Sequence, residues 1–354
     1  MTTLQSAQTM TRQTILETLL AFKRTSLLRT GIEIQLFDAL AEGPRTAEQV
    51  AAALRAPERS VRVLLGAMAS AELLVEAGND TYALVEGAEA LLVTSSPDYA
   101  GDAVLVAASY PEWDALRDLT AVVYNDGTVL DTDLSSPQFG YWEDFAAHGT
   151  FATRPVADAV GNVLSERLTD LPSASGEQVR VLDLGCGHGL FGLLLAQQFP
   201  KVHVWCMDRR PVLHYAGRNA EAMGLTARTT LVDADALTDD LGGPYDLVLL
   251  ANFLPEYSEE QGTQLLQRVS QALAPEGRVV VAGFTVGDRP AVAEFGAHML
   301  SLLMMSWTPG GQVHTSAAYQ RMFKSAGYGA VQEHDVPGLP TRIFVAEIAT
   351  ESVA

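Results

Sequence analysis

An acid followed by three closely spaced glycines is the feature of this sequence best suited to chemistry. The run 181–184 predicts a buried strand that contains Asp183, and 190–198 predicts the helix that follows. Glycine occupies every second position of the turn 185–189, so the backbone can approach a ligand closely. The dinucleotide-binding fingerprint spaces its last two glycines more widely and holds a pyrophosphate. An acid inside the motif would instead repel phosphate and attract an ammonium group.

Acids also end the next two predicted strands. Asp208 closes the strand 202–207, where a carboxylate can accept both hydroxyls of a ribose. Asp233 and Asp235 end the third strand, and one of them could accept from an adenine amino group. S-adenosylmethionine combines an ammonium group, a ribose diol and an adenine without phosphate. Any one of these acids is equally well explained as a strand-end cap, but the ordered series predicts a site for this cofactor.

The strands that follow complete the predicted domain. The fourth, 245–250, leads to Asn252, the fifth, 278–284, follows a turn at 275–277, and two more lie near 331–335 and 343–348. This order predicts an α/β Rossmann-like fold with a seven-stranded sheet. The predicted cofactor-binding residues are Asp183, Gly185, Cys186, Gly187, Asp208, Arg209, Asp233, Asp235, Ala236 and Asn252.

The N-terminal hundred residues predict an all-α, winged-helix domain. An amphipathic helix is expected over 11–27, with an apolar stripe that a second subunit could cover, formed by Ile15, Leu19, Leu20 and Phe22. Three further helices are expected. The first covers 32–40, the second begins at a capping box formed by Thr46 and Gln49, and the third covers 57–71. A hairpin that forms the wing follows them. The predicted division is 1–100 for dimerisation, 101–172 for a helical linker and active-site roof, and 173–354 for cofactor binding.

Composition narrows the possible partners and compartment. The net charge of −20 argues against nucleic acid and anionic membranes, and residues 29–85 carry five basic against eight acidic side chains. No apolar run approaches a membrane span, and no signal peptide is evident. Two cysteines without metal-ligand spacing fit a reduced cytoplasm, and no metal site is expected.

On these motifs, residues 178–350 resemble class I S-adenosylmethionine-dependent methyltransferases. The whole chain resembles the small-molecule O-methyltransferase family, which includes the plant caffeate enzymes, acetylserotonin methyltransferase and bacterial natural-product enzymes. The resemblance implies a homodimer built on the winged module, and an apolar or aromatic acceptor from secondary metabolism.

The catalytic motif of that family is not intact in this sequence. The resembling enzymes use a histidine as base, within Leu-His-Asp-Trp or Leu-His-His-Phe after the fourth strand, and two acids orient it. Here the stretch is Asn-Phe-Leu-Pro-Glu-Tyr over 252–257, so Pro255 takes the histidine position, and Gly283 and Val313 take those of the acids. The remaining candidate bases, each also explicable as a structural side chain, are His148, Glu256, Tyr257, His298 and His314.

Aromatic and methionine-rich segments are candidates for the acceptor site. They lie in the predicted roof and in an apolar helix expected over 291–307, and either could equally be plain core. The predicted substrate-binding residues are Trp113, Trp142, Phe151, His298, Met299, Leu302 and Met305.

Loss of the base has three chemical interpretations. The acceptor could be a ring carbon that loses its proton after attack, it could be an acidic group or one served by a relocated base, or methyl transfer could have been replaced by another reaction. The complete cofactor motif favours methylation, and within methylation we favour carbon. A metabolite-sensing DNA-binding regulator is the alternative from outside enzymology, and the acidic charge opposes it.

Overall fold

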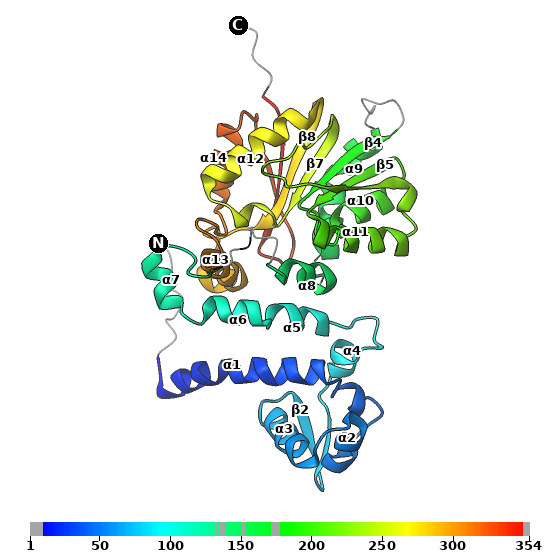
Figure 1. The fold of residues 1–354 in the computed structure, drawn as a ribbon, viewed down its shortest axis with the longest axis vertical. Coiled ribbons are helices and arrows are strands. Elements are labelled where there is room, and N and C mark those ends of the chain that lie inside the picture. The colour runs from blue at the N-terminus through cyan, green and yellow to red at the C-terminus, as the bar shows by residue number, and fades with distance from the viewer. Residues whose placement is uncertain (1–9, 132–133, 135–138, 151–152, 171–177, 350–354) are drawn as a thin grey trace. The chain divides into compact units, whose positions relative to one another are not determined.

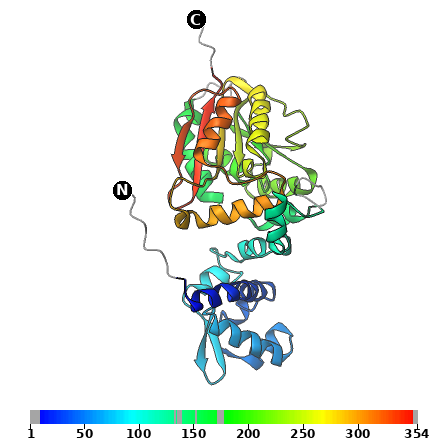
Figure 2. The same cartoon turned by 90° about the vertical axis from the view of Figure 1, so that its left-hand side faces the viewer.

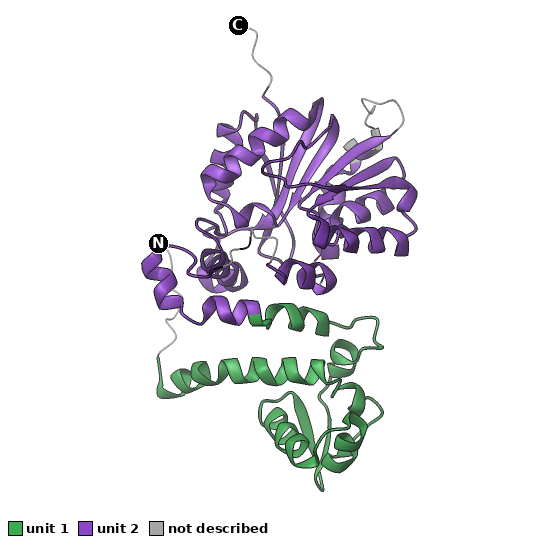
Figure 3. Ribbon diagram, viewed as in Figure 1, with its two compact units in different colours: residues 1–110 green, residues 111–354 purple. Residues whose placement is uncertain are grey.

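The computed structural model describes residues 10–131, 134, 139–150, 153–170 and 178–349. The chain forms two compact units, 1–110 and 111–354 (Figure 3), and helix α6 (Tyr110–Leu116) crosses the boundary between them. None of the helices in the described part of the chain is long and apolar enough to cross a membrane.

The N-terminal unit begins with one long helix, α1 (Arg12–Glu33). We expected two helices, over 11–27 and 32–40, and this was wrong. Gly31 does not interrupt α1, because its bare backbone packs against Phe37, where an added β-carbon would lie 2.7 Å from the ring. The helix ends only near Gln35, whose φ is 57°. A short 3-10 turn, η1 (Asp38–Leu40), then replaces the second predicted helix.

The winged module follows the predicted order. Thr46 and Gln49 form both hydrogen bonds of the capping box that starts α2, and the hairpin turns at Asn79 and Asp80 with φ of 50° and 60°. The strand β1 adds a third member to the predicted two-stranded wing. The remaining elements of this unit are β1 (Arg45–Thr46), α2 (Ala47–Leu54), α3 (Glu58–Ser70), β2 (Leu74–Gly78), β3 (Thr81–Leu84), α4 (Ala88–Leu92) and α5 (Gly101–Ala107).

The C-terminal unit contains the predicted seven-stranded sheet, in the order β6-β5-β4-β7-β8-β10-β9. The first five strands along the chain run parallel, and β10 is antiparallel to both of its neighbours. The strands are β4 (Val179–Leu184), β5 (Val202–Asp208), β6 (Thr229–Asp233), β7 (Tyr245–Ala251), β8 (Leu273–Phe284), β9 (Gln332–Asp335) and β10 (Thr341–Glu347). Strand β8 starts five residues before the predicted Arg278, because a shift in its register with β7 absorbs the expected turn at 275–277.

Helices cover both faces of this sheet over two apolar cores (Figures 1 and 2). One core includes Val181, Leu193 and Val204, and the other includes Leu182, Leu266 and Tyr319. The helical elements are α7 (Leu119–Asn125), α8 (Tyr141–His148), α9 (Thr153–Asp170), α10 (Leu190–Gln198), α11 (Arg210–Ala222), η2 (Thr226–Arg228), η3 (Leu254–Glu256), α12 (Glu259–Ala272), η4 (Ala291–Glu294), α13 (Phe295–Trp307) and α14 (Ser316–Ser325). Figure 1 shows α8 and α13 at one end of the sheet.

Candidate active site

The glycine turn lies between β4 and α10, at the carboxyl end of the parallel strands, where open α/β sheets bind ligands. All three glycines have positive φ, which only glycine adopts without strain: 66° at Gly185, 54° at Gly187 and 71° at Gly189. The amides of Gly185 and Cys186 donate to the carbonyl of Met207, so the end of β5 fixes the turn. A β-carbon added at Gly187 would meet nothing within 4 Å among the described residues, which leaves that backbone accessible.

Asp183 lies buried beneath this turn. Its Oδ2 accepts from the amide of Gly192 in the first turn of α10, at 2.9 Å. Its Oδ1 is buried and has no hydrogen-bond partner among the described residues. Burial raises the pKa of Asp183 to about 8, and the Gly192 amide opposes that shift. A buried acceptor without a partner fits a cationic hydrogen-bond donor.

Asp208 joins the glycine turn to the next strand. Its Oδ2 accepts from the amide of Gly187 at 2.8 Å, and its Oδ1 accepts from the amide of Arg209 at 2.7 Å. Burial raises the pKa of Asp208, and these two amides oppose the shift. Each carboxylate oxygen can accept a second hydrogen bond, so Asp208 retains the capacity to receive a diol.

The acids after β6 are less enclosed. Asp233 is paired in register with Asp208 across β5 and β6, but it is exposed and forms an ion pair with Arg210 at 2.7 Å. Asp235 is half-buried, and its Oδ1 accepts from the amide of Leu237. Ala236 is buried beside it. The sheet thus brings these residues to the same edge as Asp208.

The segment after β7 carries the departure from the resembling family. Asn252 has φ of 55°, and its backbone amide donates to the carbonyl of Ala282 at 2.7 Å. Pro255 is buried within η3 and offers no proton-transfer group. Glu256 follows Pro255 in the chain. Desolvation is the main cause that raises the pKa of the Glu256 carboxyl to about 8, and the negative charge of Asp208 is the second.

The other candidate bases are in different surroundings. His314 is buried, its Nε2 is 3.0 Å from the carbonyl oxygen of Tyr257, and burial lowers its pKa. Desolvation is the main cause that raises the pKa of Tyr257, and the charge of Glu256 is the second. His298 is half-exposed on α13, with Nε2 3.8 Å from Glu294, and His148 is the last residue of α8. The backbone at Tyr257 therefore holds His314, and the charges of Glu256 and Asp208 both act on Tyr257.

Helix α8 packs onto the cofactor loop. Phe145 stacks on His188, with ring centroids 6.4 Å apart and planes 16° apart. His188 accepts from the amide of Leu190 at the start of α10, and burial lowers its pKa to about 4, so it is neutral. The indole of Trp142 and the guanidinium of Arg209 both donate to the carbonyl of Leu134. The predicted roof and the predicted cofactor site are therefore in contact.

A half-buried acid in this roof was missed by the sequence analysis. Glu112 on α6 accepts a hydrogen bond from the hydroxyl of Tyr141 at 3.0 Å. Desolvation raises the pKa of the Glu112 carboxyl to about 7, although this hydrogen bond lowers it. The ring of Tyr141 lies 4.5 Å from that of Trp307, whose Nε1 is buried without a hydrogen-bond partner among the described residues. Only the aromatic residues around Glu112 signalled this position in the sequence.

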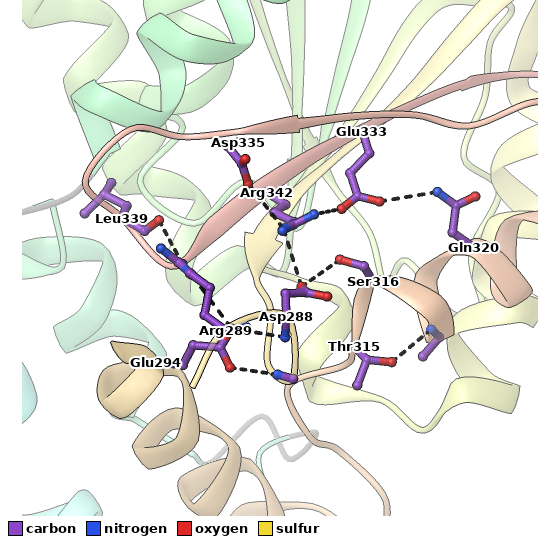
Figure 4. A network of polar contacts seen from close by, with 12 residues as sticks. Asp288, Arg289, Glu294, Thr315, Ser316, Gln320, Glu333, Asp335, Leu339 and Arg342 are labelled. Carbon is purple, nitrogen blue, oxygen red and sulfur yellow. Dashed lines mark hydrogen bonds and ion pairs between the residues drawn. The ribbon is translucent and has the colours of Figure 1, made fainter. Parts of the chain in front are cut away.

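A network of polar contacts anchors α13 (Figure 4). Glu294 is fully buried and accepts from the amides of Gly287, Asp288 and Arg289. Asp288 also accepts from Ser316, and Arg342 links it to Glu333 and Asp335 on β9. The start of α13 is thereby tied to the edge of the sheet.

The predicted acceptor residues lie on several elements. Met299 on α13 is exposed, and the half-buried members are Trp113 on α6, Trp142 on α8, and His298, Leu302 and Met305 on α13. Phe151 lies outside the described residues. In the part of the chain that the structure describes, no group of three or more His, Cys, Asp or Glu side chains could hold a metal ion.

The sheet, the glycine turn and the acids at its edge define a Rossmann-like methyltransferase. Family models agree: an O-methyltransferase domain matches residues 169–329, and an O-methyltransferase dimerisation domain matches residues 16–94. The chain belongs to the O-methyltransferase family and is an S-adenosylmethionine-dependent methyltransferase.

Individual relatives differ in the atom that they methylate. The chain is 30% identical to the 3-hydroxy-5-methyl-1-naphthoate 3-O-methyltransferase of Streptomyces sahachiroi, over 87% of each chain. It is 29% identical to the N,N-dimethyltransferase OxyT of Streptomyces rimosus, over 79% of this chain and 80% of OxyT. A protein from Nostoc punctiforme assigned to the O-methyltransferases has the same fold, with a TM-score of 0.85, 29% identity, and coverage of 96% of this chain and 99% of that one. Family membership therefore leaves the acceptor atom open.

Proposed function

We propose that this enzyme methylates a small aromatic natural-product intermediate, and that the buried, unpartnered Oδ1 of Asp183 receives the ammonium group of S-adenosylmethionine. Asp208 accepts from the ribose, and the backbone of Gly185, Cys186 and Gly187 lies along the ligand. The remaining predicted contacts, at the adenine end and beyond β7, are Arg209, Asp233, Asp235, Ala236 and Asn252. The cofactor supplies a methyl group on a sulfonium, so the chain's own task is to align the acceptor and to manage its proton.

The acceptor site is proposed to lie within the C-terminal unit, beside α8, with α13 as a second wall. The stack of Phe145 on His188 supports this placement, because it holds the aromatic side chains of α8 directly at the cofactor loop. Trp307 offers an indole N–H and Glu112 a carboxyl for polar groups of the acceptor. Aromatic walls with a few polar groups suit a flat, mostly apolar molecule.

Glu256 is the proposed proton acceptor. It follows Pro255, its pKa of about 8 is near working pH, and the charge of Asp208 acts on it. We favour a nucleophilic ring carbon as the methylated atom, because such a carbon needs no base before attack and releases its proton afterwards to Glu256. An acidic hydroxyl is the second candidate, and it is favoured by the 3-O-methyltransferase name of the 30% identical relative.

The N-terminal unit is proposed to form a homodimer in the cytoplasm. The dimerisation-domain match and the exposed apolar side chains of α1 support the dimer. A DNA-binding role is disfavoured, because Arg62 of the winged module is already paired with Glu58 and Asp80. A mobility-shift assay at low salt would reveal DNA binding directly.

The chemistry is tested with S-adenosylmethionine labelled with ¹³C in its methyl group, followed by NMR of the product from candidate aromatic acceptors. A carbon-bound methyl resonance supports the primary proposal, and an O-methyl resonance selects the second candidate. Failure of S-adenosylhomocysteine to bind the wild-type protein in calorimetry would reject the cofactor site itself.

A further inference from the structure

Gly283, near the carboxyl end of β8, lies beside two polar side chains. A β-carbon added there would be 3.4 Å from the hydroxyl oxygen of Tyr319 and 3.8 Å from Oδ1 of Asn252. No other atom of the described residues would come within 4 Å of it, beyond the chain neighbours of Gly283. Glycine stands where the resembling family has an acid, so position 283 places no side chain beside Asn252 and Tyr319.

Both polar atoms are buried, and neither has a hydrogen-bond partner among the described residues. Tyr319 on α14 is fully buried, and its ring packs against Phe344 at 4.6 Å and His314 at 5.6 Å, which fixes the position of its hydroxyl. Thr285 follows Gly283 by two residues, and its Oγ1 is also buried and unpartnered within the described chain. Buried polar atoms seldom remain unpaired, because each loses its hydrogen bonds to water.

The chemistry of these atoms selects the occupant. The amide oxygen of Asn252 only accepts, whereas the hydroxyl of Tyr319 can donate. A water molecule can donate to the first and accept from the second, and ordered internal waters join buried polar groups in this way. We propose that an ordered internal water at Gly283 joins Asn252 to Tyr319 in place of the missing acid.

This water gives Tyr319 a positioning role. Asn252 has φ of 55°, a conformation that asparagine tolerates better than most residues but that still needs support. The 3-10 turn with Glu256 begins two residues later. A bridge from Tyr319 to the side chain of Asn252 therefore holds the start of the segment that carries the proposed proton acceptor. This inference rests on the proposed function for its catalytic consequence, but not for the water itself.

Gly283→Ala separates an occupied from an empty site by the sign of its effect. If no water is present, the new methyl group makes ordinary van der Waals contacts, and alanine can adopt the backbone conformation of Gly283 without strain. The melting temperature then remains unchanged or rises. In an occupied site, the methyl group expels the water and leaves two orphaned polar atoms, so the melting temperature falls by about 2–4 °C. Gly329→Ala is the control, since its β-carbon would meet only backbone, at 3.7 Å.

Tyr319→Phe gives an independent test. With the water present, this substitution removes a hydrogen bond and lowers the melting temperature. The positive control is Tyr328→Phe, whose hydroxyl donates to the carbonyl of Leu266 at 3.0 Å. Without the water, Tyr319→Phe removes an orphaned hydroxyl and raises the melting temperature or leaves it unchanged, which overturns the proposal. In the Gly283→Ala background, Tyr319→Phe should no longer destabilise.

The positioning role of Tyr319 is tested by measuring cofactor binding and turnover. We expect Tyr319→Phe to weaken binding of S-adenosylhomocysteine in calorimetry or to lower kcat severalfold, and Tyr328→Phe to change neither. Unchanged binding and turnover in Tyr319→Phe would reject that role even if the water is present. If the wild-type protein binds no S-adenosylhomocysteine, the proposed function fails, and the melting experiments still decide the water site.

Discussion

The amide of Gly187 donates a hydrogen bond of 2.8 Å to Oδ2 of Asp208. The second strand-end acid therefore supports the glycine turn in addition to its proposed contact with the ribose. Its removal should disturb both the ribose contact and the shape of the turn.

Asp208→Ala should weaken binding of S-adenosylhomocysteine roughly ten- to hundredfold, the effect of losing a hydrogen bond to a charged group. Isothermal titration calorimetry measures this. Asp233→Ala is a suitable comparison, because Asp233 is exposed and paired with Arg210, and a smaller loss is expected there. Equal affinity in wild type and Asp208→Ala would refute the assignment.

Asp183 should make both cofactor binding and stability depend on pH. Burial raises its folded pKa to about 8, above the value of about 3.9 for free aspartate, so its stabilising contribution is complete below pH 4 and is lost as pH rises to 8. The ammonium group of the ligand prefers the ionised acid. S-adenosylhomocysteine should therefore bind up to about tenfold more tightly per pH unit between pH 6 and 8. Asp183→Asn should bind weakly with a flat profile, and a flat wild-type profile would contradict the role.

Glu256→Gln should lower kcat, because glutamine cannot take up the acceptor's proton. The loss should reach about 10²–10⁴-fold if proton removal occurs in the transition state, and be smaller for a carbon acceptor that is deprotonated later. In the wild type, the rate should rise with pH towards the pKa of Glu256 near 8. Glu259→Gln provides a matched control, since that acid pairs with Arg321 at the surface. A full rate in Glu256→Gln would exclude it as the base.

Pro255→His should not raise the native activity appreciably. Three separate members of the family's base system are replaced, at Pro255, Gly283 and Val313, which indicates a changed acceptor rather than one lost side chain. Steady-state rates with the native acceptor measure the outcome. A hundredfold gain would show that a histidine base had merely been missing.

Leu19→Glu combined with Phe22→Glu should convert a dimer into a monomer. The two side chains are 63% and 64% exposed in the single chain, and burying two charges in their place would be costly. Light scattering after size exclusion distinguishes a mass of 37.9 kDa from twice that value. A wild-type protein that is already monomeric at micromolar concentration would disprove the proposed dimer.

The sheet could be predicted because its signals are local. Strands β4 and β7 are mostly apolar, and Gly185 and Asn252 follow them directly. The same local reasoning placed the capping box at Thr46 correctly. It failed at Gly31, where the helix continues and the glycine packs closely against Phe37.

Within the candidate site, a fixed sequence spacing was available only for the proposed cofactor side. Asp183 and Asp208 belong to a fixed spacing, whereas Glu112 meets Tyr141 across 29 residues and two helices. The hydrogen bond between His314 and the carbonyl of Tyr257 joins residues that are 57 positions apart in the sequence. Such pairs depend on how helices pack over the sheet, and no spacing rule in a single sequence encodes that.

The anchoring of α13 by Glu294 determines which substitutions the helix tolerates. One carboxylate satisfies three amides at the base of the helix, so substitutions at that end would cost stability. Along the same helix, Phe295 and Met299 are 66% and 44% exposed, and mutations there lose few contacts. The fold thus separates a buried attachment from an exposed face, so substitutions on that face would leave the scaffold and the glycine turn unchanged.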